Sequence, residues 1–397
     1  MKRFFPLLLG IFIFLGICLS QKGSSSPPAI VEYSSPILFP EPNPSLIEGA
    51  FRTKEHWSVD PTARIAIVPH HLIAARPMAS LFSTLPKAKY IIILSPDHFS
   101  QGETSFTVPS HDLCTGSNKQ FNCAGGKIAN ELIQSIIQQV TSTRRQDEAF
   151  AREHGVYTLI PFLRRTQPEA KIIPVLLKQD APKEELESLS TALLQIMLAN
   201  PDTLMLSSVD MSHYQTQEVA DFHDALTQSI IDHLDLDRVN KAETDSPETL
   251  AVTLTAAQRL GLQAQKLSHT NSLILTRAIL DRVSTSHLIV RFGTSAIPLS
   301  TQRLETEFWH QLPKIATEED RLYRGFDGER IFDEPTLPYF FGVVRQGITT
   351  HVYPFPFDQE RQLLTREARI TQIIKDELHL KTWLTTNLKT KAFELIY

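Results

Sequence analysis

The sequence lacks the signatures of a nucleotide-binding protein and of a repeat protein. It contains neither a G-x-G-x-x-G run nor a P-loop, and no segment recurs at a fixed period. It also lacks an excess of charge, because 39 Lys and Arg stand against 44 Asp and Glu, and no basic patch with interleaved aromatic residues is present. We therefore expect no nucleic-acid partner.

Cysteine is scarce, with three residues in 397. Cys18 lies in the amino-terminal segment, so removal of that segment would leave the pair Cys114 and Cys123. Two cysteines so close together in an exported chain indicate a disulfide. The alternative is a pair of free thiols on a loop.

One long apolar run stands out, at residues 4–17, and two basic residues precede it. This pattern is typical of a secretory signal peptide, with a cleavage site after Ser20. The run is shorter than the about 20 residues of a membrane span, and an uncleaved anchor is the alternative. We therefore expect residues 1–20 to be a signal peptide or membrane anchor. The protein is predicted to be extracytoplasmic, either secreted or anchored to a membrane by this segment.

The rest of the chain divides into three segments by composition. Residues 21–57 are rich in Ser and Pro and are predicted to form an extended tether. Residues 58–300 alternate short apolar runs with longer amphipathic stretches and are predicted to form the main domain. Residues 301–397 are predicted to form a small α+β appendage, to which we assign no role. It has a pair of strands in "LPYFFGVVRQGITTHVYPFPFD" and a helix in "QERQLLTREARITQIIKDEL".

The alternation within residues 58–300 predicts an α/β fold. The runs "ARIAIVP", "KYIIILS", "KIIPVLL" and "TLMLSS" are almost wholly apolar, as buried strands are, and "SHLIVRFGT" indicates a last strand near residue 290. The stretches "GGKIANELIQSIIQQV", "APKEELESLSTALLQIMLAN", "EVADFHDALTQSIIDHLD" and "SPETLAVTLTAAQRLG" have helical patterns. We predict a mostly parallel central sheet with helices on both faces.

Three of the predicted strands are each followed by a histidine. His70, His98 and His213 come just after them, and Asp97 and Asp210 lie close by. A single histidine in such a place is usually a loop residue. Ligands in open α/β sheets bind outside the carboxyl ends of the strands, so three histidines at such ends favour one shared pocket.

A fourth segment, at residues 153–163, begins with Glu153 and His154 and continues into an apolar stretch. Taken alone it is the start of a helix, since acidic residues suit the first turn. Together with the strand ends it predicts a further wall of the same pocket.

These four segments, in this order, resemble the Memo family, called AmmeMemoRadiSam system protein B in prokaryotes. They are "VPHHLIAA" (68–75), "LSPDHFSQG" (94–102), "EHGVYTLIPFL" (153–163) and "SSVDMSHY" (207–214). The family's counterparts are similar to "PHAGY", "GPSHH", "EHSIE-QLPFL" and "SSDLSHY". The resemblance covers about residues 60–295. It implies a fold similar to that of the class III extradiol dioxygenases, which hold non-haem iron at strand ends.

The resemblance also implies a metal centre, with His70 and His98 as ligands. The third ligand in the family is a cysteine, which this chain lacks at the corresponding "AETDSPETL" (242–250). Glu243, Asp245 or Glu248 would supply a carboxylate in its place, and we take Asp245 as the candidate. Two histidines and one carboxylate are the ligands of non-haem Fe(II) sites. Iron or copper is the expected metal and zinc a further alternative; binding no metal is the other outcome.

The remaining polar residues of the four segments are candidate catalytic groups. The resemblance makes His154 and His213 pocket histidines, and an imidazole can act as acid or base near neutral pH. Asp210 would orient His213 by accepting its other ring N–H. Tyr214 would donate a hydrogen bond to a bound oxyanion or phenolate. Asp97 either shares in the site or caps the turn that follows it.

Three functions are consistent with these residues. The first is a metal-dependent oxidoreductase that acts on an unknown small molecule. The second is a metal-dependent hydrolase, in which the same ligands activate water. The third is a binding or scaffold protein that has kept the fold without the chemistry. Fold alone does not choose among them.

Overall fold

The computed structural model describes residues 36–39, 41–117, 120–215, 217–276, 284–294, 339–346, 349–356 and 393–396. Its largest element is a nine-stranded sheet in the order β10-β12-β2-β9-β3-β8-β4-β7, with β11 paired to β12. The strands are β2 (Ile65–Val68), β3 (Tyr90–Pro96), β4 (Phe106–Val108), β7 (Thr143–Arg145), β8 (Lys171–Leu177), β9 (Thr203–Ser208), β10 (His213–Gln215), β11 (Gln263–Asn271) and β12 (Ser284–Gly293).

The centre of this sheet is parallel and its edges are mixed. Strands β2, β9, β3 and β8 run parallel to one another. Strand β12 is antiparallel to β2, and β4 is antiparallel to β8. The four central strands are almost fully buried, which explains why they appear in the sequence as continuous apolar runs. The predicted α/β fold is confirmed.

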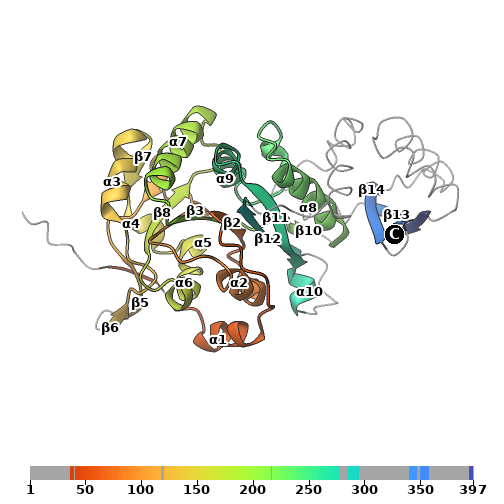
Figure 1. The fold of residues 1–397 in the computed structure, drawn as a ribbon, viewed down its shortest axis with the longest axis horizontal. Coiled ribbons are helices and arrows are strands. Elements are labelled where there is room, and N and C mark those ends of the chain that lie inside the picture. The colour runs from red at the N-terminus through yellow and green to blue at the C-terminus, as the bar shows by residue number, and fades with distance from the viewer. Residues whose placement is uncertain are drawn as a thin grey trace, which may run out of the picture. The chain divides into compact units, whose positions relative to one another are not determined.

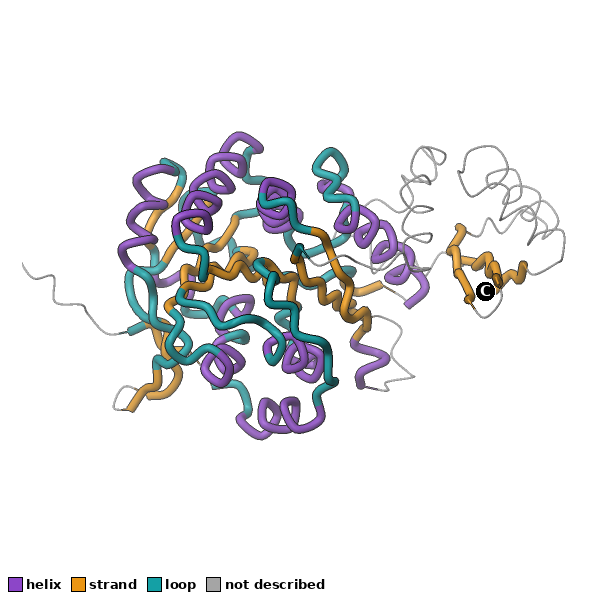
Figure 2. The backbone as a smooth tube through the Cα atoms, viewed as in Figure 1, coloured by secondary structure: helices purple, strands orange, loops and turns teal. Residues whose placement is uncertain are grey.

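Helices cover both faces of the sheet, as Figure 1 shows. Helices α3, α7 and α9 lie on one face and α2, α5 and α6 on the other. Figure 2 shows the strands as a band between these two groups. The helices are α1 (Pro44–Thr53), α2 (Ala75–Phe82), α3 (Asn130–Gln139), α4 (Asp147–Phe150), α5 (His154–Tyr157), α6 (Ile160–Thr166), α7 (Lys183–Ala199), α8 (Gln217–Asp232), α9 (Pro247–Arg259) and α10 (Ser272–Thr276), with the 3₁₀ turns η1 (Leu72–Ala74) and η2 (Val239–Lys241).

The strand register brings three sequence segments to one edge of the sheet. Val68, at the end of β2, lies opposite Ser208, at the end of β9. Leu94 of β3 lies opposite Ser207 of β9. Because these strands are parallel neighbours, the residues that follow them emerge side by side.

The predicted tether of residues 21–57 is wrong for its second half. Strand β1 (Ile37–Phe39) pairs in parallel with β5 (Leu113–Ser117), which pairs with β6 (Gln120–Asn122). Helix α1 begins after Asn43, whose side chain accepts a hydrogen bond from Ser45 N. Ile47 and Phe51 of this helix are buried in the core. Four prolines between residues 36 and 44 hide these apolar anchors when composition is averaged over the segment.

The predicted pair of carboxyl-terminal strands is present as β13 (Tyr339–Gln346) and β14 (Thr349–Pro356), which are antiparallel. Strand β15 (Phe393–Ile396) pairs with β13 to complete a three-stranded sheet. The helix predicted near residues 359–378 lies outside the described residues, as does the amino-terminal signal or anchor. None of the described helices is long and apolar enough to span a membrane.

Candidate metal centre

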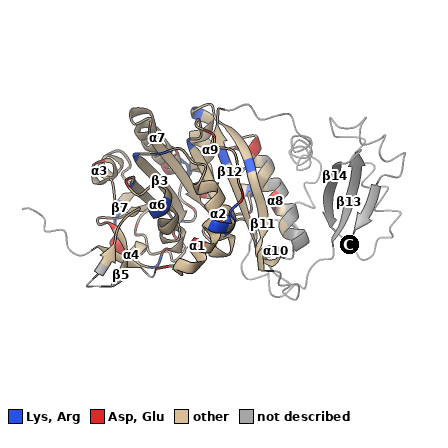
Figure 3. Ribbon diagram, turned by 60° about the horizontal axis from the view of Figure 1, so that its bottom comes forward, with Lys and Arg blue, Asp and Glu red and all other residues tan. Residues whose placement is uncertain are grey.

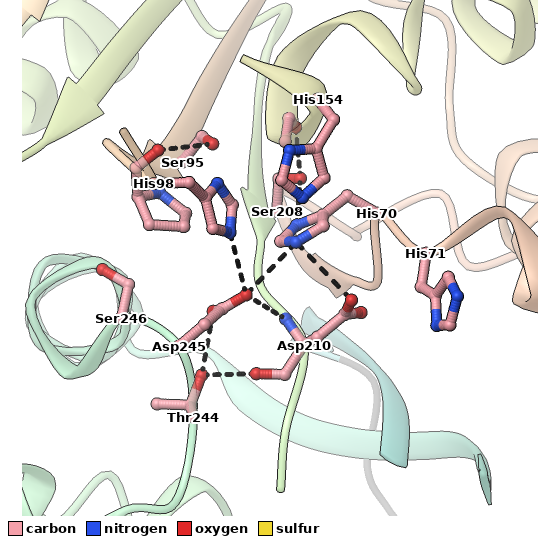
Figure 4. A network of polar contacts seen from close by, with 12 residues as sticks. His70, His71, Ser95, His98, His154, Ser208, Asp210, Thr244, Asp245 and Ser246 are labelled. Atoms are coloured by element: carbon pink, nitrogen blue, oxygen red, sulfur yellow. Dashed lines mark hydrogen bonds and ion pairs between the residues drawn. The ribbon is translucent and has the colours of Figure 1, made fainter. Parts of the chain in front are cut away.

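Two histidines and one aspartate from three segments meet at the carboxyl edge of the central strands. Nε2 of His70 lies 3.2 Å from Oδ2 of Asp245, and Nε2 of His98 lies 3.5 Å from the same oxygen. Figure 4 shows the three side chains pointing toward one another. His70 follows β2, His98 follows β3, and Asp245 lies two residues before α9. These are the three residues predicted as metal ligands.

The other ring nitrogen of each histidine is held from behind. Ser208 donates its hydroxyl hydrogen to Gly155 O, so it accepts the Nδ1–H of His70 at 3.3 Å. The Nδ1–H of His98 donates to Oε1 of Glu153 at 2.6 Å. Both rings therefore present Nε2 to the centre of the site. An outer partner on the second nitrogen is what metal-binding histidines usually have, because it fixes the tautomer.

Asp245 is positioned by reciprocal hydrogen bonds with Asp210. Asp210 N donates to Oδ2 of Asp245 at 3.1 Å, and Asp245 N donates to Asp210 O at 3.2 Å. Thr244 Oγ1 donates to the same carbonyl at 2.8 Å. Ser246 then caps α9 by accepting a hydrogen bond from Thr249 N. The start of this helix thus holds the carboxylate against the end of β9.

Glu153 is fully buried and serves as the anchor for His98. Its carboxylate accepts hydrogen bonds from the backbone N–H groups of His98 and Gly155 as well as from the His98 ring. Burial alone would raise the pKa of Glu153, but the hydrogen bond from His98 leads the effects that lower it. Burial alone would lower the pKa of His98, but hydrogen bonds to Asp245 and Glu153 raise it to about 10.

The carboxylate of Asp245 is ionised although it is buried. Burial would raise the pKa of Asp245, and the charge of His70 together with hydrogen bonds from both histidines lowers it below its usual value. His70 behaves in the opposite sense. Burial would lower its pKa, and Asp210 and Asp245 raise it.

His154 lies on the open side of this group. Its ring stacks on that of His98, with centroids 4.2 Å apart, and it is 5.0 Å from the ring of His70. Its side chain is 37% exposed, against 2% for His70. Burial and the charges of His70 and His98 lower the pKa of His154 to about 4. His154 is therefore a neutral imidazole at the mouth of the site.

Asp210 does not orient His213 as predicted. Its Oδ2 lies 3.5 Å from Nε2 of His70, and its buried Oδ1 has no hydrogen-bond partner among the described residues. His213 has its Nδ1 2.6 Å from the backbone oxygen of Met211. The two-residue step from Asp210 to Ser212 carries the chain into β10, which takes His213 away from that carboxylate. The charge of His213 still contributes to lowering the pKa of Asp245.

Tyr214 is half exposed and has a φ of 54°. A tyrosine in the left-handed region is uncommon, and such strained residues gather at functional sites. Its ring lies 5.8 Å from that of His213. The structure therefore places these two predicted residues together.

The other candidates have structural partners elsewhere. Asp97 caps the turn after β3, since its oxygens accept hydrogen bonds from the backbone N–H groups of Gln101 and Gly102. Glu243 faces His223, and Glu248 accepts a hydrogen bond from Asp180 N. Of the three carboxylates considered as third ligand, Asp245 is the one brought to His70 and His98.

For three residues, the sequence holds no indication of the contacts that they make at or beside the site. Glu153 has the position of an ordinary helix-start acid, and its total burial was not visible. Ser208 ends a strand like many serines. His287 lies in the apolar strand β12, where a single histidine cannot be told from a core residue. Their roles depend on contacts between segments that are distant in sequence.

The spacing of Asp245 from each of the two histidines suits a divalent metal ion. Two ligand atoms bound at about 2.1 Å to one ion at angles of about 90–110° lie about 3.0–3.4 Å apart. The distances of 3.2 Å and 3.5 Å from Asp245 to the two histidines are close to this range. Among the described residues, His70, His98 and His154 form one metal-capable group, and His70, Asp210 and Asp245 form another.

Fold and site together define an α/β protein with a cluster of histidines and aspartates at the carboxyl ends of its parallel strands. A sequence model of the Memo-like proteins matches residues 45–289. The chain belongs to this family. The predicted recognition is confirmed.

Curated relatives of this chain are MEMO1 family proteins. One from Saccharolobus islandicus strain Y.G.57.14 is 26% identical over 191 residues, which are 46% of this chain and 65% of the relative. One from Saccharolobus solfataricus is 24% identical over 220 residues, 52% of this chain and 75% of the relative. One from Thermotoga maritima is 26% identical over 148 residues, 36% of this chain and 50% of the relative. The chain thus spans less than two thirds of the first of these proteins.

Among solved structures, an uncharacterized protein, JW3007 from Escherichia coli K12, is similar with a TM-score of 0.40 and 13% identity. The match covers 58% of this chain and all of that one.

Proposed function

We propose that this protein is a metal-dependent oxidoreductase that acts on a small molecule, with one divalent ion held by His70, His98 and Asp245. The observation that carries the proposal is the position of two Nε2 atoms within 3.5 Å of one carboxylate oxygen, each ring being held at its Nδ1. Two histidines and one carboxylate suit non-haem Fe(II) and leave coordination positions open. Imidazole ligands also suit copper and zinc.

Different side chains of the protein would hold the ligands of such an ion and contact the substrate. The ion would supply Lewis acidity and, for iron or copper, one-electron chemistry with oxygen. Ser208 and Glu153 keep the rings of His70 and His98 turned inward. His154 is neutral at pH 7 and about one third exposed, so its unprotonated ring nitrogen can accept a hydrogen bond from a substrate hydroxyl. Tyr214 can donate its phenolic hydrogen to an oxygen of the substrate.

We also propose that the protein works outside the cytoplasm. The support is the basic and apolar amino terminus and the pair Cys114 and Cys123, whose sulfur atoms lie at disulfide distance. In the described part of the chain, basic and acidic residues are interspersed (Figure 3). We propose a small molecule as the substrate.

Metal content after anaerobic purification tests the proposal. We expect the native protein to carry iron or another divalent ion, and His98→Ala and Asp245→Ala to lose it while remaining folded. His56→Ala is the matched control, because His56 is exposed and lies outside the metal-capable groups among the described residues. Equal metal content in native protein and in both site variants would overturn the proposal.

The type of reaction is tested separately with the metal-loaded protein. An oxidoreductase of this kind consumes oxygen in the presence of catechol-like substrates. Hydrolysis of ester or amide substrates without oxygen uptake would assign the site to a hydrolase. Purified native protein that takes up no divalent ion would indicate the scaffold function.

A further inference from the structure

A second group of metal-capable side chains lies on the far side of Asp210 from Asp245. It consists of His71, Asp210 and His287, and their ligand atoms lie within 4.8 Å of one another. Nδ1 of His71 and Nε2 of His287 are 3.1 Å apart. That is within the about 3.0–3.4 Å expected for two ligand atoms on one ion.

The backbone explains how two neighbouring histidines serve two places. His71 is extended, with φ −77° and ψ 112°, and successive side chains of an extended chain point to opposite sides. His70 therefore turns toward Asp245, and His71 turns toward β12, which carries His287. Figure 4 shows the carboxylate of Asp210 between the rings of His70 and His71.

An unpaired buried carboxylate oxygen at this place points to a cation site. Oδ1 of Asp210 and Nδ1 of His287 are buried and have no hydrogen-bond partner in the described part of the chain. A buried carboxylate oxygen without a partner is unfavourable, and a bound cation would satisfy it. The ion would bind Nε2 of His287, which lies on the side of His71, and Nδ1 would then carry the ring hydrogen.

We propose that His71, Asp210 and His287 hold a second divalent transition-metal ion. Asp210 would offer Oδ1 to this ion, and its Oδ2 already faces His70 at 3.5 Å. The second site stands on its own three residues. We add that Asp210 would bridge the two ions by offering Oδ2 to the first one, and this addition rests on the proposed function. Two imidazoles and a carboxylate suit zinc, iron, cobalt or copper rather than magnesium or calcium.

The rival interpretation is that His71 and His287 are a buried hydrogen-bonded pair. The two are separated by titrating metal-free, full-length protein with Co²⁺ and counting bound ions after removal of excess metal. We expect two Co²⁺ per chain for the native protein and for His56→Ala. We expect one for His71→Ala and one for His98→Ala. A single ion in the native protein that His71→Ala still binds, or two ions in His71→Ala, would overturn the second site.

The same titration keeps the two proposals apart. If His98→Ala still binds two ions, the first site is wrong whatever His71→Ala does. Asp210→Asn tests the bridge, and we expect it to weaken both sites by more than about 100-fold, beyond the loss caused by removing an outer partner. Weakening at one site only would refute the shared role. The count on the native protein needs no variant to fold.

The stabilisation by metal gives a second readout. Bound Co²⁺ raises the melting temperature of a protein whose site exists in the folded state. His71→Ala should keep only part of the shift seen in the native protein. If His71 and His287 are merely structural, the variant lowers the melting temperature equally with and without Co²⁺, and the proposal fails.

Discussion

At the scale of single residues, the ligands were predictable and their supports were not. His70 and His98 follow apolar strands, so their convergence follows from the parallel arrangement of those strands. Asp245 is the candidate that we take from three carboxylates in a short segment, although no feature of the sequence ranks it above the other two. The choice is made by two backbone hydrogen bonds between Asp245 and Asp210, which join residues 35 positions apart.

The third ligand sets the preference for the metal. The family resemblance implies a cysteine where this chain has Asp245. We expect Asp245→Cys to retain metal binding and to shift it toward zinc and copper(I), because thiolate is a softer ligand than carboxylate. Competition between Fe²⁺ and Zn²⁺, followed by metal analysis, measures the shift. Asp245→Ala is the control and should bind neither ion tightly. An unchanged Fe²⁺ to Zn²⁺ ratio in Asp245→Cys would show that residue 245 does not touch the metal.

Metal binding at His98 should release a proton. In the metal-free protein the pKa of His98 is about 10, so the ring is protonated at pH 7. A metal ion binds the deprotonated Nε2, and its affinity therefore rises with pH up to about that value. Glu153→Gln removes one of the groups that raise this pKa, so fewer protons should leave at a pH between the lowered pKa and about 10. Calorimetric titration in buffers of different ionisation enthalpy counts them. Equal counts in the native protein and in Glu153→Gln, with Glu103→Gln as the exposed control, would contradict this account.

At the scale of elements, periodicity identified the helices and strands of the central sheet and failed at its margins. Helices α3, α7, α8 and α9 and strands β2, β3, β8, β9 and β12 are all present where expected. Short strands such as β4 and β7 have too few residues to show a period, and their pairing is decided by the sheet. The sequence does not reveal helix α1, because the prolines near its start are typical of a linker. Proline is nevertheless well tolerated in the first turn of a helix.

Gly155 shows how closely one helix is packed against the metal centre. A Cβ atom there would collide with the buried Ser95 hydroxyl of β3 and would lie 3.2 Å from Oε1 of Glu153. We expect Gly155→Ala to destabilise the protein by about 1–3 kcal/mol and to weaken metal binding by displacing Glu153. Gly49→Ala, in α1, is the matched control, since its Cβ would meet nothing within 4 Å and should stabilise by about 0.5–1 kcal/mol. Chemical denaturation and metal titration report the two effects. If Gly155→Ala binds the metal with normal affinity, the packing of α5 does not affect the metal site.

The pair Cys114 and Cys123 joins two neighbouring strands. Thr115 of β5 lies opposite Asn122 of β6, so the cysteines are the next pair along, with Cα atoms 4.1 Å apart. If they are oxidised, replacing both by alanine should lower the free energy of unfolding by about 2–3 kcal/mol in the chain-entropy model. Non-reducing peptide mapping of the protein as isolated measures the bond directly. Two free thiols in that sample would refute both the bond and the argument it lends to export.

At the scale of the whole molecule, sequence composition was a better guide to fold than to boundaries. The α/β class follows from the alternation of apolar and amphipathic stretches over some 240 residues. An error in the bounds of one strand or helix does not change this fold class. The predicted start of the domain at residue 58 was too late, because an anchoring strand and helix precede it. Boundaries depend on single apolar contacts, such as those of Phe39 and Phe51, and composition averages over them.

The carboxyl-terminal segment, residues 301–397, is expected to be dispensable for metal binding. Every residue of the two candidate sites lies before residue 300, and β13, β14 and β15 pair only with one another among the described strands. A chain that ends at residue 300 should therefore fold, melt within about 2–4 °C of the native protein, and bind the same number of Co²⁺ ions. A chain that ends at residue 283 is the contrasting variant. It lacks β12, which pairs with β2, β10 and β11 and carries His287, so it should fail to fold. Aggregation or loss of metal in the longer truncation would make the carboxyl-terminal segment part of the domain rather than an appendage.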